Sequence, residues 1–324
     1  MLESIKALKA VESDILACDD KIANIEKHDK ESQEKATKRK KVIKLSSFFG
    51  GVFAFLFLIG YFALYPLISY LVGNYGAYIK VYNITEFTVP DGTKEIKDYA
   101  FDGCRSLESI TIPDTVTTIG YDAFRHCDNL KNLHISDIEK WCNVSMSDGW
   151  SAPFCNSFSG NNLYLNGEIV TNLVIPDSVN VIKDKAFYHC TGITTVVMLD
   201  SVTSIGKYAF TGCTSLKEIT LSTCITDIGE AAFDQCKNLK EITIPYGVTI
   251  IKSRTFYNCD KLECIIIPDS VTSIGRDAFE HVWLYPLENV YYTGSEEDWG
   301  KIDIDESNYR LKWYNVKIHY NYTP

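Results

Sequence analysis

The chain has 324 residues, 46% of them hydrophobic, which is enough for a sizeable core and for two domains. Residues 1–44 carry 11 basic and 9 acidic side chains, and residues 45–79 carry no charge. The rest carries 21 basic against 33 acidic residues, a net charge of −12, which argues against nucleic acid as a partner. Eleven cysteines spread along so long a chain are not typical of a small disulfide-stapled scaffold.

The first segment, residues 1–44, is expected to form a short cytosolic helix that ends in a basic run. Its apolar residues recur at alternating steps of three and four, at Leu8, Val11, Ile15, Cys18, Ile22 and Ile25. This heptad spacing predicts a weak coiled-coil seam over 8–25 that would support a homo-oligomer. A solvated amphipathic helix near a membrane explains the same pattern equally well.

The next segment, residues 45–73, is predicted to be a transmembrane helix. Residues 48–72 read FFGGVFAFLFLIGYFALYPLISYLV, a stretch long enough to cross the core of a lipid bilayer. A buried core helix and a cleavable signal peptide fit this length less well. The basic run KATKRKKVIK at 35–44 precedes the span, so the positive-inside rule predicts a single-pass protein with a cytosolic N-terminus. Residues 74–83 are expected to be a linker to an extracellular part.

A repeat of 23 residues governs the chain from residue 84 onward, as in LESITIPDTVTTIGYDAFRHCDN at 107–129. Regular units begin at Ile84, Leu107, Val170, Ile193, Leu216, Leu239 and Leu262. The alternation in I-x-I predicts a half-buried strand, and Pro-Asp predicts a turn after it. Each unit is too small to bury its own apolar face, so neighbouring units must stack. This predicts an α/β-type repeat solenoid over 84–286, with parallel strands and one strand per coil.

Two coils are longer than the others. The insert at about 136–169 contains DIEKWCNVSM and NNLYLNG, and the C-terminal part, 287–324, contains SEEDWGKIDI and YNVKIHYN. The alignment matches Trp141 with Trp299 and Leu163 with Val316. The second long coil is expected to cap the stack, as terminal repeats must.

These motifs, above all IPDSVTSIGRDAF with the following cysteine unit, resemble the BspA-like leucine-rich repeat family over roughly residues 84–320. The resemblance implies a curved leucine-rich repeat solenoid displayed at the surface of bacteria or parasitic protists. It also implies binding to host or matrix proteins and cell–cell adhesion, without fixing a ligand. The sequence departs from the family pattern at Leu199 and Ser222, which replace the turn proline, and at Val282, which replaces the cysteine.

Six cysteines occupy one position of the repeat: Cys104, Cys127, Cys190, Cys213, Cys236 and Cys259. Equal positions in stacked coils form a line, so these thiols cannot converge on one metal ion. Their side chains point the same way, which disfavours disulfides. We interpret them as a buried core ladder, and Val282 at the same position supports this reading. No metal and no cofactor are expected.

Other reactive or modifiable residues remain open. Cys142 and Cys155 flank the insert and would be able to pair in an oxidising compartment, while Cys224 and Cys264 are expected to be incidental. Asn83, Asn143 and Asn321 stand in glycosylation sequons, which matter only in a eukaryotic source. The histidines show no catalytic or metal-binding pairing, and His126, His189 and His281, each just before the ladder position, are expected in surface loops.

A binding surface is expected on the outward strand positions, which form two columns across the sheet. Val174 and Val197 are adjacent there and apolar, with His134 beside them. With Trp141 and Trp150 in the insert, they form the preferred contact patch, because aromatic residues anchor interfaces. Burial of both tryptophans in their own coil is the alternative.

The sequence therefore predicts a membrane-anchored cell-surface protein whose solenoid binds a protein or other macromolecule without catalysis, anchored in the lipid bilayer by 48–72. An intracellular-facing scaffold is the alternative, and a hydrolase fits less well because no catalytic constellation is found.

Overall fold

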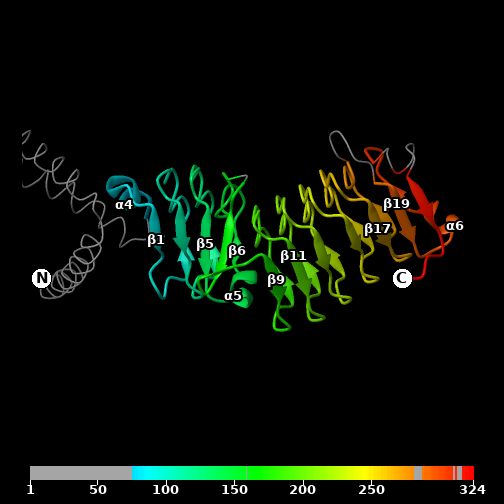
Figure 1. The fold of residues 1–324 in the computed structure, drawn as a ribbon, viewed down its shortest axis with the longest axis horizontal. Coiled ribbons are helices and arrows are strands. Elements are labelled where there is room, and N and C mark those ends of the chain that lie inside the picture. The colour runs from blue at the N-terminus through cyan, green and yellow to red at the C-terminus, as the bar shows by residue number, and fades with distance from the viewer. Residues whose placement is uncertain (1–74, 158, 281–286, 309–310, 312–315) are drawn as a thin grey trace, which may run out of the picture. The chain divides into compact units, whose positions relative to one another are not determined.

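The computed structural model describes residues 75–157, 159–280, 287–308, 311 and 316–324. Within them the chain forms a row of stacked coils that begins at a helix and ends at a long C-terminal coil (Figure 1). The segments predicted as cytosolic helix and transmembrane helix lie outside the described residues, as does Val282. None of the helices in the described part is both long and apolar enough for a membrane crossing.

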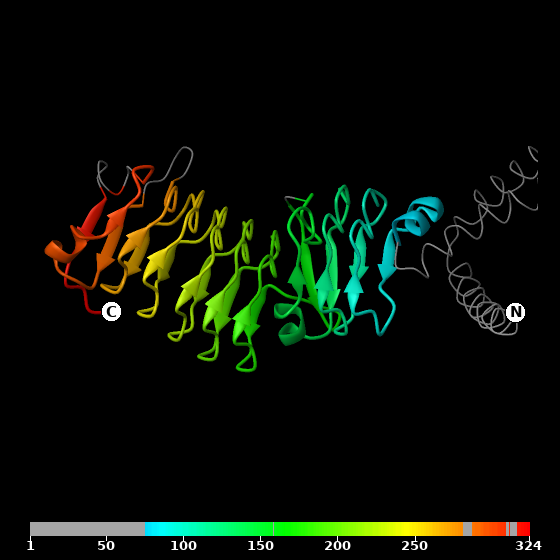
Figure 2. The same ribbon diagram turned by 180° about the vertical axis from the view of Figure 1, so that it is seen from behind.

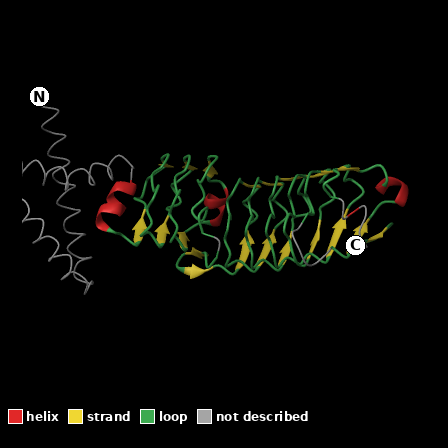
Figure 3. Ribbon diagram, turned by 90° about the horizontal axis from the view of Figure 1, so that it is seen from above, coloured by secondary structure: helices red, strands yellow, loops and turns green. Residues whose placement is uncertain are grey.

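Each regular coil contributes one longer and one shorter strand, and the two kinds run along opposite sides of the solenoid (Figure 3). The longer strands are β1 (Glu86–Thr88), β3 (Ser109–Thr111), β5 (Asn132–Ile135), β7 (Asn162–Leu165), β9 (Asn172–Ile175), β11 (Thr195–Met198), β13 (Glu218–Thr220), β15 (Glu241–Thr243), β17 (Cys264–Ile267), β19 (Asn289–Tyr292) and β21 (Lys317–His319). The shorter strands are β2 (Glu95–Ile96), β4 (Thr118–Ile119), β6 (Ser145–Met146), β10 (Val181–Ile182), β12 (Ser204–Ile205), β14 (Asp227–Ile228), β16 (Ile250–Ile251), β18 (Ser273–Ile274) and β20 (Asp303–Ile304). The parallel solenoid predicted from the repeat is thus confirmed, but the prediction of one strand per coil is corrected to two.

The expected linker at 74–83 is instead mostly helix α4 (Tyr75–Tyr82), which packs on the first coil. Its Gly76 N donates to Ala100 O at 2.6 Å, and the Tyr75 ring stacks on Phe101 at 5.2 Å between centroids. Ile79 is fully buried. The helix therefore covers apolar surface that the first coil would otherwise expose, which makes α4 a cap and not a spacer.

The two long coils, which share sequence motifs, each contain a short helix that the sequence analysis did not predict, α5 (Ile138–Cys142) and α6 (Glu296–Trp299). The longer strands later in these two coils, β7 and β21, align with each other differently from the sequence prediction. Leu163 pairs in register with Leu133, and its counterpart in the last coil, paired with Val290, is Ile318 and not Val316. A shift by two residues keeps the same face of the strand inward, so the alternation of apolar residues in the sequence did not reveal it.

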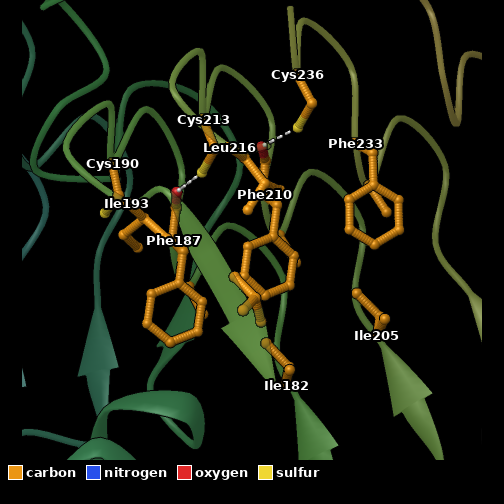
Figure 4. Packing of buried hydrophobic residues seen from close by; sticks show 14 of the residues in the cluster. Ile182, Phe187, Cys190, Ile193, Ile205, Phe210, Cys213, Leu216, Phe233 and Cys236 are labelled. Carbon is orange, nitrogen blue, oxygen red and sulfur yellow. Dashed lines mark hydrogen bonds between the residues drawn. The ribbon is translucent and has the colours of Figure 1, made fainter. Parts of the chain in front are cut away.

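Stacked phenylalanine rings and cysteine thiols fill the part of the core under the turns that follow the shorter strands (Figure 4). Phe187, Phe210 and Phe233 stack with ring centroids 5.2 and 5.6 Å apart. Two ladder thiols in this region bond to the preceding coil: Cys213 Sγ donates to Phe187 O at 3.2 Å and Cys236 Sγ to Phe210 O at 3.3 Å. Each of these carbonyls already accepts a bond within its own turn, Phe187 O from Cys190 N and Phe210 O from Cys213 N at 3.1 Å each, so the thiol adds a second donor from the next coil.

The ladder thiols are chemically quiet. Burial raises the pKa of Cys190, Cys213, Cys236 and Cys259 well above the ordinary value for a thiol, so all four stay protonated at neutral pH. Metal binding and disulfide exchange both need the thiolate. The ladder cysteines are free and buried, and among the described residues no group of metal-ligating side chains is present.

Replacing Cys213 by valine is expected to lower the free energy of unfolding by about 1 kcal/mol, because Phe187 O loses one of its two donors and keeps Cys190 N, while the volume is nearly kept. Urea unfolding of the full chain measures the change. Cys224→Val is the matched control, since this thiol is exposed and its replacement should leave the midpoint unchanged. Equal effects of the two substitutions would contradict a structural role for the ladder.

The sheets are not continuous along the solenoid. The longer strands form three sheets, in the orders β1-β3-β5-β7-β8, β9-β11-β13 and β15-β17-β19-β21. The shorter strands divide at the same two places, into β2-β4-β6, β10-β12-β14 and β16-β18-β20. We call the resulting parts segment 1 (84–169), segment 2 (170–238) and segment 3 (239–324), and the divisions the first and second seams. The uninterrupted row of strands expected from the repeat is therefore corrected to three rows.

The residue after the short strand accounts for much of this division. Gly206 N and Gly229 N donate to the preceding coil, to Ile182 O at 2.7 Å and Ile205 O at 2.8 Å. A Cβ on Gly229 would lie 2.4 Å from the backbone of that coil, so glycine permits the close approach. The coils that open segments 2 and 3 carry Lys183 and Lys252 at this position. Lys183 N donates to Cys142 O at 2.9 Å instead of to a short strand, and the short strands separate at both places. Ser147 and Asp305 occupy the same position and still donate to the preceding coil despite their side chains, but both belong to long coils.

Like charges add to the second seam. Glu218 and Glu241 occupy the same outward position in β13 and β15, where two neighbouring coils would place their carboxylates side by side. Like charges directly opposite each other destabilise strand pairing. The opposite edge stays closed, with Phe233 N donating to Thr255 O at 3.0 Å and Cys259 Sγ donating to Phe233 O at 3.2 Å. The second seam is therefore tight at the ladder, whereas β13 and β15 are not paired, although Lys240 N donates to Lys217 O at 3.4 Å just before them.

Candidate interaction surface

The outward positions of the longer strands lie in register as two columns. One column includes Thr195 between Asn172 and Glu218, and the other includes Val197 between Val174 and Thr220. Strand β7 adds Asn162 and Tyr164 to the columns in segment 1, and β21 adds Lys317 and His319 in segment 3. The sequence columns lacked these four residues because the long coils hid their strands.

The valine pair, Val174 and Val197, lies on the outward face of the longer strands β9 and β11. Figure 2 shows the same solenoid from behind. Val174 is 54% exposed and Val197 37% exposed, although apolar β-branched side chains usually face the core. Their side chains are held in position by strands whose other residues, such as Leu173 and Val196, are buried. The pair is a small rigid apolar surface whose burial by a partner would be favourable.

His134 lies in segment 1 and does not share a sheet with the valine pair. It is partly exposed, pairs in register with Tyr164 and stacks on that ring at 4.4 Å between centroids, with 14° between the planes. Strand β8 (Glu168–Ile169) pairs antiparallel with β7 and leaves Ile169 half exposed. The aromatic pair and Ile169 thus form a second exposed group beside the first seam.

Trp141 is not part of the surface. It is 3% exposed, and its Nε1 donates to Ala186 O at 2.7 Å across the first seam. Lys185 Nζ supports the same junction by donating to Ser147 O at 2.7 Å. The prediction of a contact role for Trp141 is corrected, because this indole joins segment 1 to segment 2.

Trp150 is 45% exposed, but it lies elsewhere on the solenoid. Its backbone N donates to Asp122 Oδ1 at 2.9 Å, while Phe124 N donates to Trp150 O at 3.1 Å. These bonds place Trp150 at the edge that carries the Ala-Phe turn, away from the columns. The expectation that it joins the valine pair in one patch is therefore corrected.

A buried polar cluster fills the first seam near the ladder. The carbonyl oxygens of Ser157 and His189 accept hydrogen bonds from His189 Nδ1 at 3.0 Å and Asn161 Nδ2 at 2.9 Å, respectively. His189 is 2% exposed, so its expected place in a surface loop is corrected, whereas His126 is exposed as expected. Thr191 completes the cluster, because its Oγ1 accepts a bond from Asn161 N at 2.8 Å.

Cys142 and Cys155, the candidates for a disulfide, are both free and buried. Burial raises the pKa of each thiol to about 12. Cys155 Sγ lies 3.5 Å from Phe124 O, the carbonyl that a ladder thiol would reach in a regular coil. Cys155 therefore takes over the role of a ladder cysteine inside the insert, and the sequence spacing gave no sign of it.

Acidification below neutral pH is expected to destabilise the first seam through His189. Burial is the largest cause that lowers its pKa, and the carbonyls of Ser157 and Phe154 oppose the shift. The folded chain therefore resists protonation while the unfolded chain takes up a proton near pH 6.5, about the ordinary imidazole value. The stabilising contribution is complete above that pH and declines as the pH falls through it.

The measurement is urea unfolding of the full chain at a series of pH values, with His189→Gln and His126→Gln. His189→Gln should flatten part of the acid decline, and His126→Gln should leave it unchanged because that ring is exposed. An identical pH profile for wild type and His189→Gln would refute the assignment.

The stacked coils, their inward leucine and isoleucine ladder and their parallel strands together define a leucine-rich repeat protein. The chain belongs to the family of the BspA type leucine rich repeat region, whose model matches residues 74–146 and 159–283 in six copies. The resemblance inferred from the motifs is thus confirmed. No curated protein matches the chain.

Solved structures of similar proteins come from several bacteria. A leucine rich cell surface protein from Faecalibacterium prausnitzii has 24% identity over 68% of this chain and 82% of its own, with a TM-score of 0.42. A leucine-rich repeat protein from Bacteroides ovatus has 24% identity over 74% of this chain and 66% of its own, with a TM-score of 0.38. The pneumococcal vaccine antigen PcpA has 15% identity over 74% and 80%, with a TM-score of 0.36.

Proposed function

We propose that this chain is a membrane-anchored surface protein whose solenoid recognises a protein or other macromolecule without catalysis. The valine pair, exposed and held in register on the open strand face, is the observation that carries the proposal. Family membership supports a repeat protein with a binding role. The anchor over 48–72, the cytosolic N-terminus and the homo-oligomer through 8–25 rest on the sequence pattern alone.

The recognition mechanism follows from rigidity. Val174 and Val197 are β-branched and lie in paired strands, so few rotamers are lost when a partner covers them. The neighbouring Asn172 and Thr195 side chains bond to each other at 2.8 Å and give the pair a polar rim. An apolar centre with a polar rim is the usual arrangement of a protein interface.

Charging the valine pair is expected to abolish capture of the partner from surface extracts. The variant combines Val174→Lys with Val197→Glu, so that the introduced charges attract each other and the strands stay paired. Retention on the full-length, detergent-solubilised chain should fall by about tenfold or more, as for a central interface position. The control is Val181→Lys with Ser204→Glu, a register pair in the shorter strands. Equal retention by all three proteins would discard the valine pair as the contact.

Membrane topology is tested separately by protease treatment of intact cells. If the solenoid is extracellular, it should be degraded together with a known surface protein. Survival of the solenoid under these conditions would reverse the proposed orientation and favour an intracellular-facing scaffold.

A further inference from the structure

The second seam opens a groove on the strand face between β13 and β15. The groove has a volume of about 500 Å³. Its apolar lining includes Ile219, Leu221, Ile244, Tyr246 and Ile266. Tyr246 is 69% exposed, the largest exposed fraction among the large hydrophobic side chains of the described residues. The groove is therefore an unfilled apolar surface that adjoins Val197 through Thr220 but is not lined by the valine pair.

Backbone groups that a continuous sheet would pair are left unpaired beside this groove. Elsewhere the residue after a long strand donates to the next coil, as Val89 N does to Thr111 O and Ile244 N to Ile266 O, both at 2.9 Å. At the second seam, no such bond between Leu221 N and Thr243 O is found in the part of the chain that the structure describes. An open donor and an open acceptor thus lie on facing strands, and unpaired edges of this kind bind extended chains.

The polar lining selects for the same kind of ligand. Hydroxyl groups of Thr220, Thr223, Thr243 and Thr293 line the groove, and each can both donate and accept a hydrogen bond. Glu241 is the sole charged side chain of the lining, and Glu218 occupies the neighbouring position of the same column. The last residue, Pro324, also lines the groove. The charge at this site therefore calls for a cation in the ligand.

We propose that the groove at the second seam binds a peptide segment in an extended conformation. Its alternate apolar side chains would lie against Ile219, Leu221 and Tyr246, and a lysine or arginine would reach Glu241. Its backbone amides would meet the open groups of Leu221 and Thr243. This proposal deepens the proposed recognition function, because it names a class of ligand for a second site. It rests on that function in one respect, namely that the strand face is the side that binds.

The closed ladder edge makes the groove a permanent feature of the solenoid. Arg254 pairs with Asp234 at 3.0 Å across the seam, and Lys252 pairs with Asp227 at 2.6 Å. Phe233 and Phe256 stack at 5.7 Å between centroids. These contacts, with the bond from Lys240 N to Lys217 O at 3.4 Å before the strands, fix the two coils to each other without pairing β13 and β15, so a ligand meets a preformed groove and not one that it must open.

The test uses a phage-displayed library of short random peptides, selected in parallel on the full-length chain and on four variants. Two variants alter the groove, Glu241→Lys and Tyr246→Ser. Two are matched controls: Glu86→Lys changes the same column in β1, and Ile250→Ser changes an exposed residue on the other side of the coil that carries Tyr246. All four positions are exposed, so folding should be preserved.

Wild type and both controls are expected to enrich peptides that alternate β-branched residues and carry a lysine or arginine. Glu241→Lys and Tyr246→Ser should reduce binding of an enriched peptide by about tenfold or more. The same peptide with alternate amides N-methylated should bind as weakly to wild type. The proposal is overturned by a lack of enrichment on wild type, by equal binding to the groove variants, or by binding of glycans but no peptide. Failure of the valine-pair experiment leaves these outcomes unaffected, so the two proposals fail separately.

Discussion

Replacement of Phe210 by alanine is expected to lower the free energy of unfolding by about 3–5 kcal/mol. The ring is fully buried and lies between Phe187 and Phe233, with centroids 5.2 and 5.6 Å away. Its loss removes stacking contacts on both sides and leaves a cavity that backbone bonds to the adjacent coils prevent from collapsing. Urea unfolding of the full chain gives the total, and hydrogen exchange locates the loss.

The location of the loss is as informative as its size. In a solenoid each coil contacts only its neighbours, so exchange should accelerate in segment 2 and much less in segment 1. Tyr246→Ala serves as the control, because this aromatic side chain is mostly exposed and should cost little. A loss under about 1 kcal/mol, or an even acceleration along the whole solenoid, would show that the phenylalanine stack is not what couples the coils.

The regular coils were predictable because one pattern determines each of them. Alternation in β9 and β11 fixes which side chains are buried, and the repeat then fixes the register between strands. The valine pair followed directly, since Val174 and Val197 are one repeat apart. The turns are also robust, as Val202 N still donates to Leu199 O at 3.3 Å where the turn proline is missing.

The seams were not predictable from a pattern that treats all coils alike. Whether two coils approach closely depends on a variable position, glycine at Gly206 and Gly229 but lysine at Lys183 and Lys252. The first coil also carries lysine at this position, Lys97. In the first coil of each of the three segments, the short strand therefore ends in isoleucine and is followed by lysine. The signal was present in the sequence, but its meaning appears only when the distance between neighbouring backbones is known.

The insert was the hardest part to predict, because its residues pack between segments. The sequence predicts Trp141 in the contact patch and His189 in a surface loop beyond the insert, yet each is buried where two coils meet. The hairpin β7–β8 did have a local signal: Asn166 and Gly167 both have positive φ, at 52° and 87°, as a tight two-residue turn requires. That signal would have identified Tyr164 and Ile169 as outward residues.

Replacement of Gly229 by alanine is expected to lower the free energy of unfolding by about 3 kcal/mol, the upper part of the range for overpacking. The new Cβ would lie 2.4 Å from Lys207 N and from the Gly206 carbonyl carbon, which are backbone atoms that cannot rotate away. Relief requires the coils to separate, which breaks the bond from Gly229 N to Ile205 O, now 2.8 Å long. The substitution should therefore create a third seam, between β12 and β14.

Hydrogen exchange measures this opening directly, because the amide of residue 229 should lose protection together with its neighbours in β14. Gly300→Ala is the matched control: the nearest atom to its new Cβ is 3.5 Å away, an ordinary contact, so stability should change little. If alanine at 229 leaves both stability and protection at the wild-type level, close approach at Ile-Gly is not what joins the coils. The Ile-Lys coils would then need another explanation for the places where the sheets divide.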